Sequence, residues 1–317
     1  MYSKLLYSHV HLSQMSSAID IMRVIFGLTF LGFASYTDFK TRRVKDEVWI
    51  LMGLFGGVFL ALQMFLEKKG WEYYLIFFPV SVLFISLFFN LESIFKKEKK
   101  TYYFKVFALY MVGIIPVIYQ FYALSSETYF YQLLTIPILI IFFYILYQFD
   151  ILHGGADAKA MMAIAILVPF YPHFFFFPLM GFSSERVAMA MEVFFPFAFL
   201  VLMNSVLFIV WVFIGFIIYN TSKGDFGFPE MLLGYRMDIQ NVENKFVWPM
   251  EKIVKGERVM VLFPKKNDDE SLDKLKKLGI KRIWVTPKIP FIVFLTVGFM
   301  ISAIIGNGFV FIIGLFA

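Results

Sequence analysis

Two aspartates in this sequence lie at the edges of long apolar segments, where an ionisable side chain is costly and is a candidate for function. Asp38 stands at the end of one such segment, and Asp157 stands just before another, far along the chain. If two carboxyl groups come within about 3–5 Å, they cannot both ionise easily, and the pair shares one proton. The ionised member can then deprotonate a water while the protonated member polarises a carbonyl, which is chemistry that hydrolyses a peptide bond.

The residues around Asp157 are small. The segment from position 154 to 159 consists of Gly154, Gly155, Ala156, Asp157, Ala158 and Lys159. Because glycine lacks a Cβ atom, the two glycines let a helix start and a substrate strand approach each other closely. The same glycine pair is also compatible with an ordinary turn before a helix.

Each aspartate taken alone has a simpler explanation. Asp38 is compatible with a solvated carboxylate beside Arg42 and Arg43. Asp157 is compatible with a favourable anion in the first turn of a helix, where the helix dipole is positive. We interpret the neighbouring basic residues as headgroup anchors, except Lys159, which we expect near the two carboxyl groups.

Composition places these residues in a membrane protein. Of the 317 residues, 60% are hydrophobic, 21% are aromatic and only 16% are charged, whereas a soluble domain carries about a quarter charged residues. Uncharged runs of about 20 residues predict transmembrane helices. The sequence therefore predicts an all-α polytopic membrane protein with about eight transmembrane helices, at residues 19–36, 48–66, 73–89, 106–124, 129–149, 160–184, 193–222 and 289–317.

The Lys and Arg residues are concentrated in loops on one side of the predicted helices. Short basic loops lie at residues 40–45 and 96–105, and the long segment 221–287 is also basic. Because basic loops remain in the cytoplasm, this side is assigned to the cytoplasmic face of the cell membrane, together with Asp38 and Asp157. The net charge of +6 then reflects topology and attraction to anionic lipids rather than nucleic-acid binding.

A second charged pair lies near the other end of the first predicted helix. Asp20 and Arg23 are three positions apart, so they share one face of the helix and partly neutralise each other. Long side chains near a helix end reach toward the lipid headgroups. We interpret this pair as interfacial.

The segment 221–287 is the only part large enough for a water-facing domain. Residues 259–263 and 282–285 are β-type runs, and residues 269–278 have the pattern of a capped helix that ends at Gly279. A small cytoplasmic α/β subdomain is predicted, either for substrate docking, for contacts with the pilus system, or as a passive connector. The predicted domains are a membrane domain of seven helices with both aspartates at 1–220, this subdomain at 221–287, and a C-terminal transmembrane helix at 288–317.

No cofactor and no metal site are predicted. The sequence has no cysteine, and its four histidines form no His-Glu-x-x-His pattern. A Ser and His constellation for serine proteolysis is not recognisable either. Two carboxyl groups remain the candidate catalytic groups.

Three separated segments together resemble a known family. They are Asp38 with its basic followers, the Gly-Gly-Ala-Asp-Ala-Lys run at 154–159, and the Ile-Trp-Val-Thr-Pro-Lys-Ile-Pro run at 283–290. In this order they resemble the archaeal preflagellin and prepilin peptidases, which are membrane aspartyl proteases of the Gly-x-Gly-Asp type related in chemistry to the bacterial type IV prepilin peptidases.

The resemblance implies that Asp38 and Asp157 are the catalytic residues. It also implies that the motif residues Gly154, Gly155, Ala156 and Lys159 lie near the substrate. The implied activity is the removal of a short basic leader from type IV pilin-like or archaellin precursors at the cytoplasmic membrane face. The implied partners are those precursors and membrane lipids, without nucleic acid.

This sequence departs from the family pattern at two places. Ala156 stands where the strict motif has glycine, which bears on substrate preference. The familiar archaeal preflagellin enzymes have about six spans, so the predicted count of about eight implies an extra helix pair, placed within residues 73–124. Such a pair preserves topology, because two crossings return the chain to the same side, and it favours a distinct subgroup that serves pilin-like precursors.

Other classes remain open from the residues alone. A presenilin-like intramembrane protease also uses two aspartates, although no Pro-Ala-Leu segment is present in the C-terminal part. A transporter would place polar groups near the midplane and often shows internal repeats, whereas Gln120 and Asn204 are among few mid-span polar residues here. A scaffold for pilus assembly would tolerate the loss of either carboxyl group.

Overall fold

The computed structural model describes residues 2–89, 99–152, 154–180, 190, 192–254, 256–264 and 269–306. The chain divides into two compact units, one made of residues 1–205 and 291–317 and the other of residues 206–290. The predicted basic loop at 96–105 lies only partly within the described residues, and His153 lies outside them.

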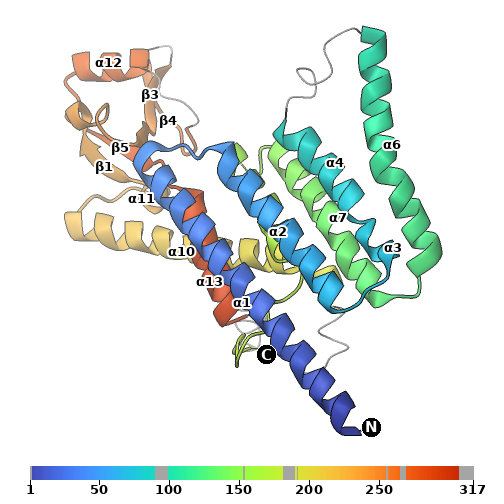
Figure 1. Cartoon of the computed structure of the whole chain (residues 1–317). Coiled ribbons are helices and arrows are strands. Elements are labelled where there is room, and N and C mark those ends of the chain that lie inside the picture. Colours follow the sequence, from blue (N-terminus) through green and yellow to red (C-terminus); the bar gives the residue numbers. More distant parts are fainter. Residues whose placement is uncertain are drawn as a thin grey trace. The chain divides into compact units, whose positions relative to one another are not determined.

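The first unit consists of helices. They are α1 (Tyr2–Thr41), α2 (Asp46–Leu66), α3 (Trp71–Tyr74), α4 (Phe77–Phe88), α6 (Lys99–Leu124), α7 (Thr128–Gln148), α8 (Gly155–Leu167), the start of α10 (Phe197–Lys223) and α13 (Phe291–Ile304). Figure 1 shows α1, α2, α4 and α7 running alongside one another. The prediction of a mainly helical protein is confirmed for these residues.

Six stretches of the described chain are long and apolar enough to cross a membrane, judged by length and composition. They are Ser16–Thr41, Asp46–Leu66, Trp71–Phe88, Tyr102–Leu124, Thr128–Gln148 and Phe197–Lys223. Each corresponds to one of the predicted segments. The protein is therefore a multi-pass membrane protein, while the predicted count of about eight spans is not confirmed.

The predicted helix at residues 160–184 is wrong in its extent. Helix α8 starts earlier, at Gly155, and ends at Leu167 after 13 residues, which is about 20 Å of helix and too short for a hydrocarbon core of about 30 Å. Pro169, Pro172 and Pro178 follow closely, and each removes a backbone donor and disfavours helix in the residue before it. The last predicted helix is observed only as α13, with 14 residues, and residues 307–317 lie outside the described part.

Helix α8 forms the centre of the first unit. Ala158 and every residue from Ala160 to Leu167 are buried, as expected for a helix that is apolar on all sides and enclosed by its neighbours. Helix α2 approaches closely at Gly56, where a Cβ atom would lie 2.6 Å from the Cα atom of Leu167. The end of α8 is thus held by a tightly packed core.

Helix α1 is held against α13. The hydroxyl groups of Ser35 and Thr296 lie 2.7 Å apart, and the Ser35 hydroxyl also donates to the Ile292 carbonyl at 3.2 Å. Gly27 faces the ring of Phe299, because a Cβ atom at position 27 would lie 2.4 Å from it. These contacts fix the part of α1 that precedes Asp38.

The second unit contains a small mixed fold. Its elements after α10 are α11 (Glu230–Leu233), β1 (Tyr235–Asp238), β2 (Val247–Pro249), β3 (Glu251–Val254), β4 (Glu257–Met260), α12 (Asp269–Lys277) and β5 (Arg282–Pro287). Strands β1, β5 and β2 form an antiparallel sheet in that order, and β3 pairs with β4. Leu275 on α12 and Ile283 and Val285 on β5 share its core.

The sequence patterns identified three of these elements, β4, α12 and β5. The predicted helix at 269–278 is observed as α12, and Gly279 adopts a φ of +73° just beyond it, a conformation that favours glycine after a helix. The predicted strand at 282–285 lies within β5, whereas β4 ends at Met260 rather than Phe263. An ion pair, in which the Arg282 guanidinium donates to both oxygens of Asp225 at 2.9 and 2.6 Å, ties the start of β5 to the end of α10.

Candidate active site

Asp38 and Asp157 come from helix ends of the first unit. Asp38 lies in the last turn of α1, and Asp157 lies in the first turn of α8. Both side chains are half-buried. Burial raises the pKa of the Asp157 carboxyl to about 7, and the nearby negative charge of Asp38 contributes to the same shift. The two predicted carboxyl groups thus lie on helices that contact each other.

Gly154 gives the Asp157 carboxylate its position. Gly154 is the residue that precedes α8, in an extended conformation with φ −100° and ψ 121°. A Cβ atom added there would lie 2.2 Å from Oδ2 and 2.8 Å from Cγ of Asp157. The carboxylate therefore folds back over Gly154 into space that any larger residue would occupy.

Gly155 and Ala156 have different surroundings from Gly154. A Cβ atom at Gly155 would lie 3.6 Å from the Tyr147 ring, which is an ordinary van der Waals distance. Ala156 is half-buried and packs against the main hydrophobic core. Of the two glycines, only Gly154 lies so close to another side chain that a Cβ atom would not fit.

Lys159 forms its ion pair with Asp46, outside the candidate catalytic pair. Its Nζ lies 2.6 Å from Oδ2 of Asp46, the first residue of α2, and 5.4 Å from the centre of the Phe88 ring. Lys159 and Asp157 are two positions apart on a helix, so they face different directions. The expectation that Lys159 lies near the catalytic pair is not supported by this geometry, since its charge is paired with Asp46.

Sequence reasoning missed two neighbours of this site. Asp46 binds Lys159, and the only signal for it is an acidic residue at a helix start, which is common. Tyr147, in the last turn of α7, places its ring beside Gly155. A tyrosine in a long aromatic-rich helix carries no pattern that distinguishes it from its neighbours.

The arrangement suits hydrolysis of a peptide bond by two carboxyl groups that share one proton. With a pKa of about 7, Asp157 retains its proton at the pH at which an ordinary aspartate is ionised. Two interacting carboxyl groups then titrate as a unit, with one proton between them. Such a pair can both accept a proton from water and donate a hydrogen bond to a carbonyl oxygen.

Two segments of the chain match known families. Residues 25–102 match the type IV leader peptidase family, and residues 228–307 match a family described as the type II archaeal peptidase A24 C-terminus. Asp38 lies within the first match. Asp157 lies between the two matched segments and within neither.

Similar proteins come from methanogenic archaea. The chain is 26% identical over 283 residues to an uncharacterised protein of Methanocaldococcus jannaschii, covering 87% of this chain and 90% of that protein. It is 29% identical to the preflagellin peptidase of Methanococcus voltae, over 49% of this chain and 64% of that protein. It is 22% identical to the preflagellin peptidase of Methanococcus maripaludis, over 90% of this chain and 96% of that protein. The likeness to the last of these extends over nearly the whole of both chains.

Proposed function

Because this chain belongs to the archaeal preflagellin peptidase family, we propose that it is an aspartic endopeptidase whose catalytic pair is Asp38 and Asp157. Its general activity is that of a membrane peptidase that cleaves leader peptides. The observation that supports the proposed mechanism is the position of Asp157 in the first turn of α8, a helix that packs against α1, whose last turn carries Asp38.

Hydrolysis by the pair proceeds with one proton held between the two carboxyl groups. The ionised carboxylate takes a proton from a bound water as the water oxygen attacks the scissile carbonyl carbon. The protonated carboxyl donates a hydrogen bond to the carbonyl oxygen and then gives its proton to the leaving amine. The C–N bond breaks, and the pair again holds one proton.

The proposed substrates are type IV pilin-like or archaellin precursors. Such a precursor has a short basic leader followed by a long apolar helix. The apolar helix would lie among the helices of the first unit, and the leader junction would then reach the ends of α1 and α8. We place this site and the 221–287 segment at the cytoplasmic face, in keeping with the basic loops of the sequence.

Cleavage of a defined precursor tests the function directly. The full chain, purified in detergent, is incubated with candidate pilin-like and archaellin precursors, and the new N-terminus is identified by mass spectrometry. We expect a single cut at the junction between the leader and the apolar segment. Cuts inside the apolar segment would favour an intramembrane protease instead, and no cut in any precursor would reject the proposal.

The activity should fall as the pH rises above neutrality. Asp157 holds the shared proton, and its pKa is raised to about 7, so the singly protonated pair is lost above that pH. One deprotonation with this pKa lowers kcat/KM by up to about ten-fold per pH unit, or about fifty-fold between pH 7 and pH 9. A pH–rate profile measured with one precursor checks this, and a profile that stays flat from pH 6 to pH 9 would contradict it.

Removing the Lys159 charge should have a small effect. In Lys159→Met, the ion pair with Asp46 is lost, but that pair is partly exposed to solvent and contributes no more than about 1 kcal/mol. The cleavage rate is expected to change by less than about three-fold, and Asp46→Asn should behave in the same way. A loss of activity in Lys159→Met alone would instead place Lys159 in contact with the substrate.

A further inference from the structure

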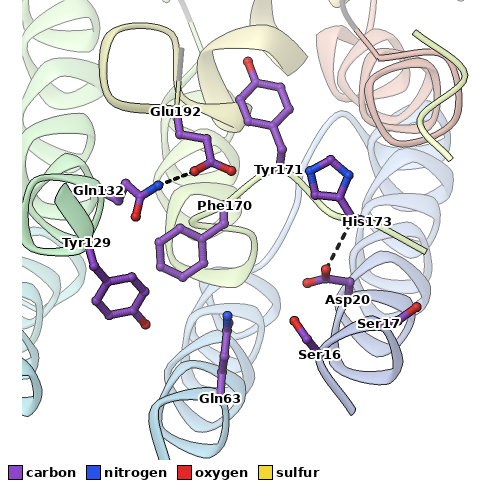
Figure 2. Close-up of a pocket in the computed structure, with 10 residues that line it drawn as sticks. All are labelled: Ser16, Ser17, Asp20, Gln63, Tyr129, Gln132, Phe170, Tyr171, His173 and Glu192. Atoms are coloured by element: carbon purple, nitrogen blue, oxygen red, sulfur yellow. Dashed lines mark hydrogen bonds between the residues drawn. The ribbon is translucent and has the colours of Figure 1, made fainter. Parts of the chain in front are cut away.

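A polar cavity lies toward the other end of α1 from Asp38. It has a volume of about 360 Å³ and is lined by side chains from α1, α2 and α7 and by Phe170, Tyr171, His173 and Glu192 (Figure 2). Asp20, which lines it, is roughly 27 Å from Asp38 along the helix axis at 1.5 Å per residue, about the thickness of the hydrocarbon core. The proposed peptidase chemistry therefore does not use this cavity.

A buried arginine, Arg23, lies behind two of the residues that line the cavity. The Arg23 side chain is 1% exposed, and its Nη1 donates to Oε1 of Gln63 at 2.7 Å and to Oδ1 of Asp20 at 3.4 Å. Asp20 and Gln63 both line the cavity. The Nε and Nη2 atoms of Arg23 are buried and have no hydrogen-bond partner among the described residues. The predicted pairing of Asp20 with Arg23 is confirmed, and the Arg23 side chain is enclosed by protein.

A second donor without a partner belongs to Tyr129. Its hydroxyl is buried, lines the cavity and has no hydrogen-bond partner in the part of the chain that the structure describes. Figure 2 shows this hydroxyl directed toward the side that Gln63 lines. The ring is held between Phe170, stacked at 5.4 Å, and Lys69, whose Nζ is 3.7 Å from the ring centre. Buried donors without acceptors are costly, so both groups indicate a ligand that supplies acceptor atoms.

The two carboxyl groups of the cavity do not exclude an anion. Asp20 accepts from Arg23 and from the backbone N–H of His173 at 3.0 Å, so its charge is compensated. Glu192 accepts a hydrogen bond from Gln132, and burial raises the pKa of its carboxyl to about 7. An anion that enters therefore meets an acid that can hold a proton near neutral pH, rather than a fixed negative charge.

We propose that this cavity binds a phosphate group, carried by a lipid headgroup or free in solution, with Arg23 and Tyr129 as its donors. A guanidinium group is the side chain best suited to a phosphate, because its planar N–H donors match the phosphate oxygens. The cavity volume lies in the range of small-molecule sites. It is large enough for a phosphate together with the alcohol of a phospholipid headgroup.

Lipid binding to the full chain tests the ligand class. The protein in detergent is titrated with phosphatidylglycerol and, separately, with a diacylglycerol that has the same acyl chains but no phosphate. Bound lipid is counted by native mass spectrometry. We expect phosphatidylglycerol to bind at least about ten-fold more tightly. Displacement by inorganic phosphate would identify a site that also takes the free anion, and no displacement would identify the headgroup as its ligand. Equal binding of both lipids would overturn the proposal.

Two variants tie that binding to the cavity. Tyr129→Phe keeps the ring stack and removes only the hydroxyl, and Arg23→Lys keeps a charge beside Asp20 but loses the planar donor fork. Each should weaken phosphatidylglycerol binding by about ten-fold. Tyr131→Phe is the matched control, since the Tyr131 hydroxyl donates to the Ser125 carbonyl at 2.9 Å and does not line the cavity.

The outcomes also separate this proposal from the peptidase function. Tyr129→Phe is expected to fold as the wild type does, because the hydroxyl that it removes has no partner among the described residues. Its leader cleavage should remain within about two-fold of wild type, so a lost lipid site and a lost peptidase site give different results. Wild-type lipid affinity in both Tyr129→Phe and Arg23→Lys would overturn the proposal.

Discussion

Replacing either Asp38 or Asp157 by asparagine is expected to lower the rate of leader cleavage by about 10³-fold or more. Neither an amide nor a single remaining carboxyl group can both accept the proton of water and donate to the carbonyl oxygen, and general acid–base catalysis contributes about 10²–10⁴-fold for each group. Cleavage is measured by the mobility shift of a co-expressed precursor and, for rates, with purified protein.

The protein itself should remain intact in these variants. Burial and the charge of Asp38 raise the pKa of Asp157, so Asp157→Asn removes an unfavourable charge and should not lower the thermal unfolding temperature. Asp46→Asn is the matched control, because Asp46 starts α2 and pairs with Lys159. It should cleave within about three-fold of wild type. Full processing by Asp38→Asn or by Asp157→Asn would reject the catalytic pair.

Gly154→Ala is expected to lower kcat by about a hundred-fold while the protein stays folded. The added Cβ atom would lie 2.2 Å from Oδ2 of Asp157, so the carboxylate has to rotate away from its present position. The backbone at position 154 is extended and accepts alanine without strain. A displacement of about 1 Å in a reacting group costs about 10² in rate, which single-turnover cleavage measures directly.

Gly155→Ala provides the control for this steric effect. Its Cβ atom would meet the Tyr147 ring at 3.6 Å, and alanine favours helix over glycine by about 1 kcal/mol at a helical position. The variant should therefore cleave within about three-fold of wild type and unfold at the same or a higher temperature. Equal activity of Gly154→Ala and Gly155→Ala would show that the close approach to Asp157 does not matter.

Local patterns in the sequence predicted much of the membrane architecture. Long uncharged runs identify α2, α6 and α7, because a hydrocarbon environment admits few other sequences. The same reasoning, combined with small residues before Asp157, singled out Asp38 and Asp157 as a pair. The structure places those two residues on helices that contact each other, and their catalytic role stays a prediction.

Other features depend on contacts that hydropathy cannot detect. Helix α8 is apolar all round, and composition does not distinguish such a buried helix from one that crosses the membrane. The burial of Arg23 could not be inferred from its neighbours in the sequence, because Gln63, its main partner, lies 40 positions away. Likewise, Lys159 binds Asp46 across 113 positions, so its direction could not be inferred from its neighbours in the motif.

The enclosure of α8 has a consequence for work in reconstituted membranes. Lipids that are thicker or thinner than the native ones tilt and strain the helices that face them. Helix α8, which carries Asp157, is buried from Ala160 to Leu167, and this part is shielded from that adjustment. Turnover by the purified protein should therefore vary little across a series of bilayers with acyl chains of different length, even where the outer helices change their tilt.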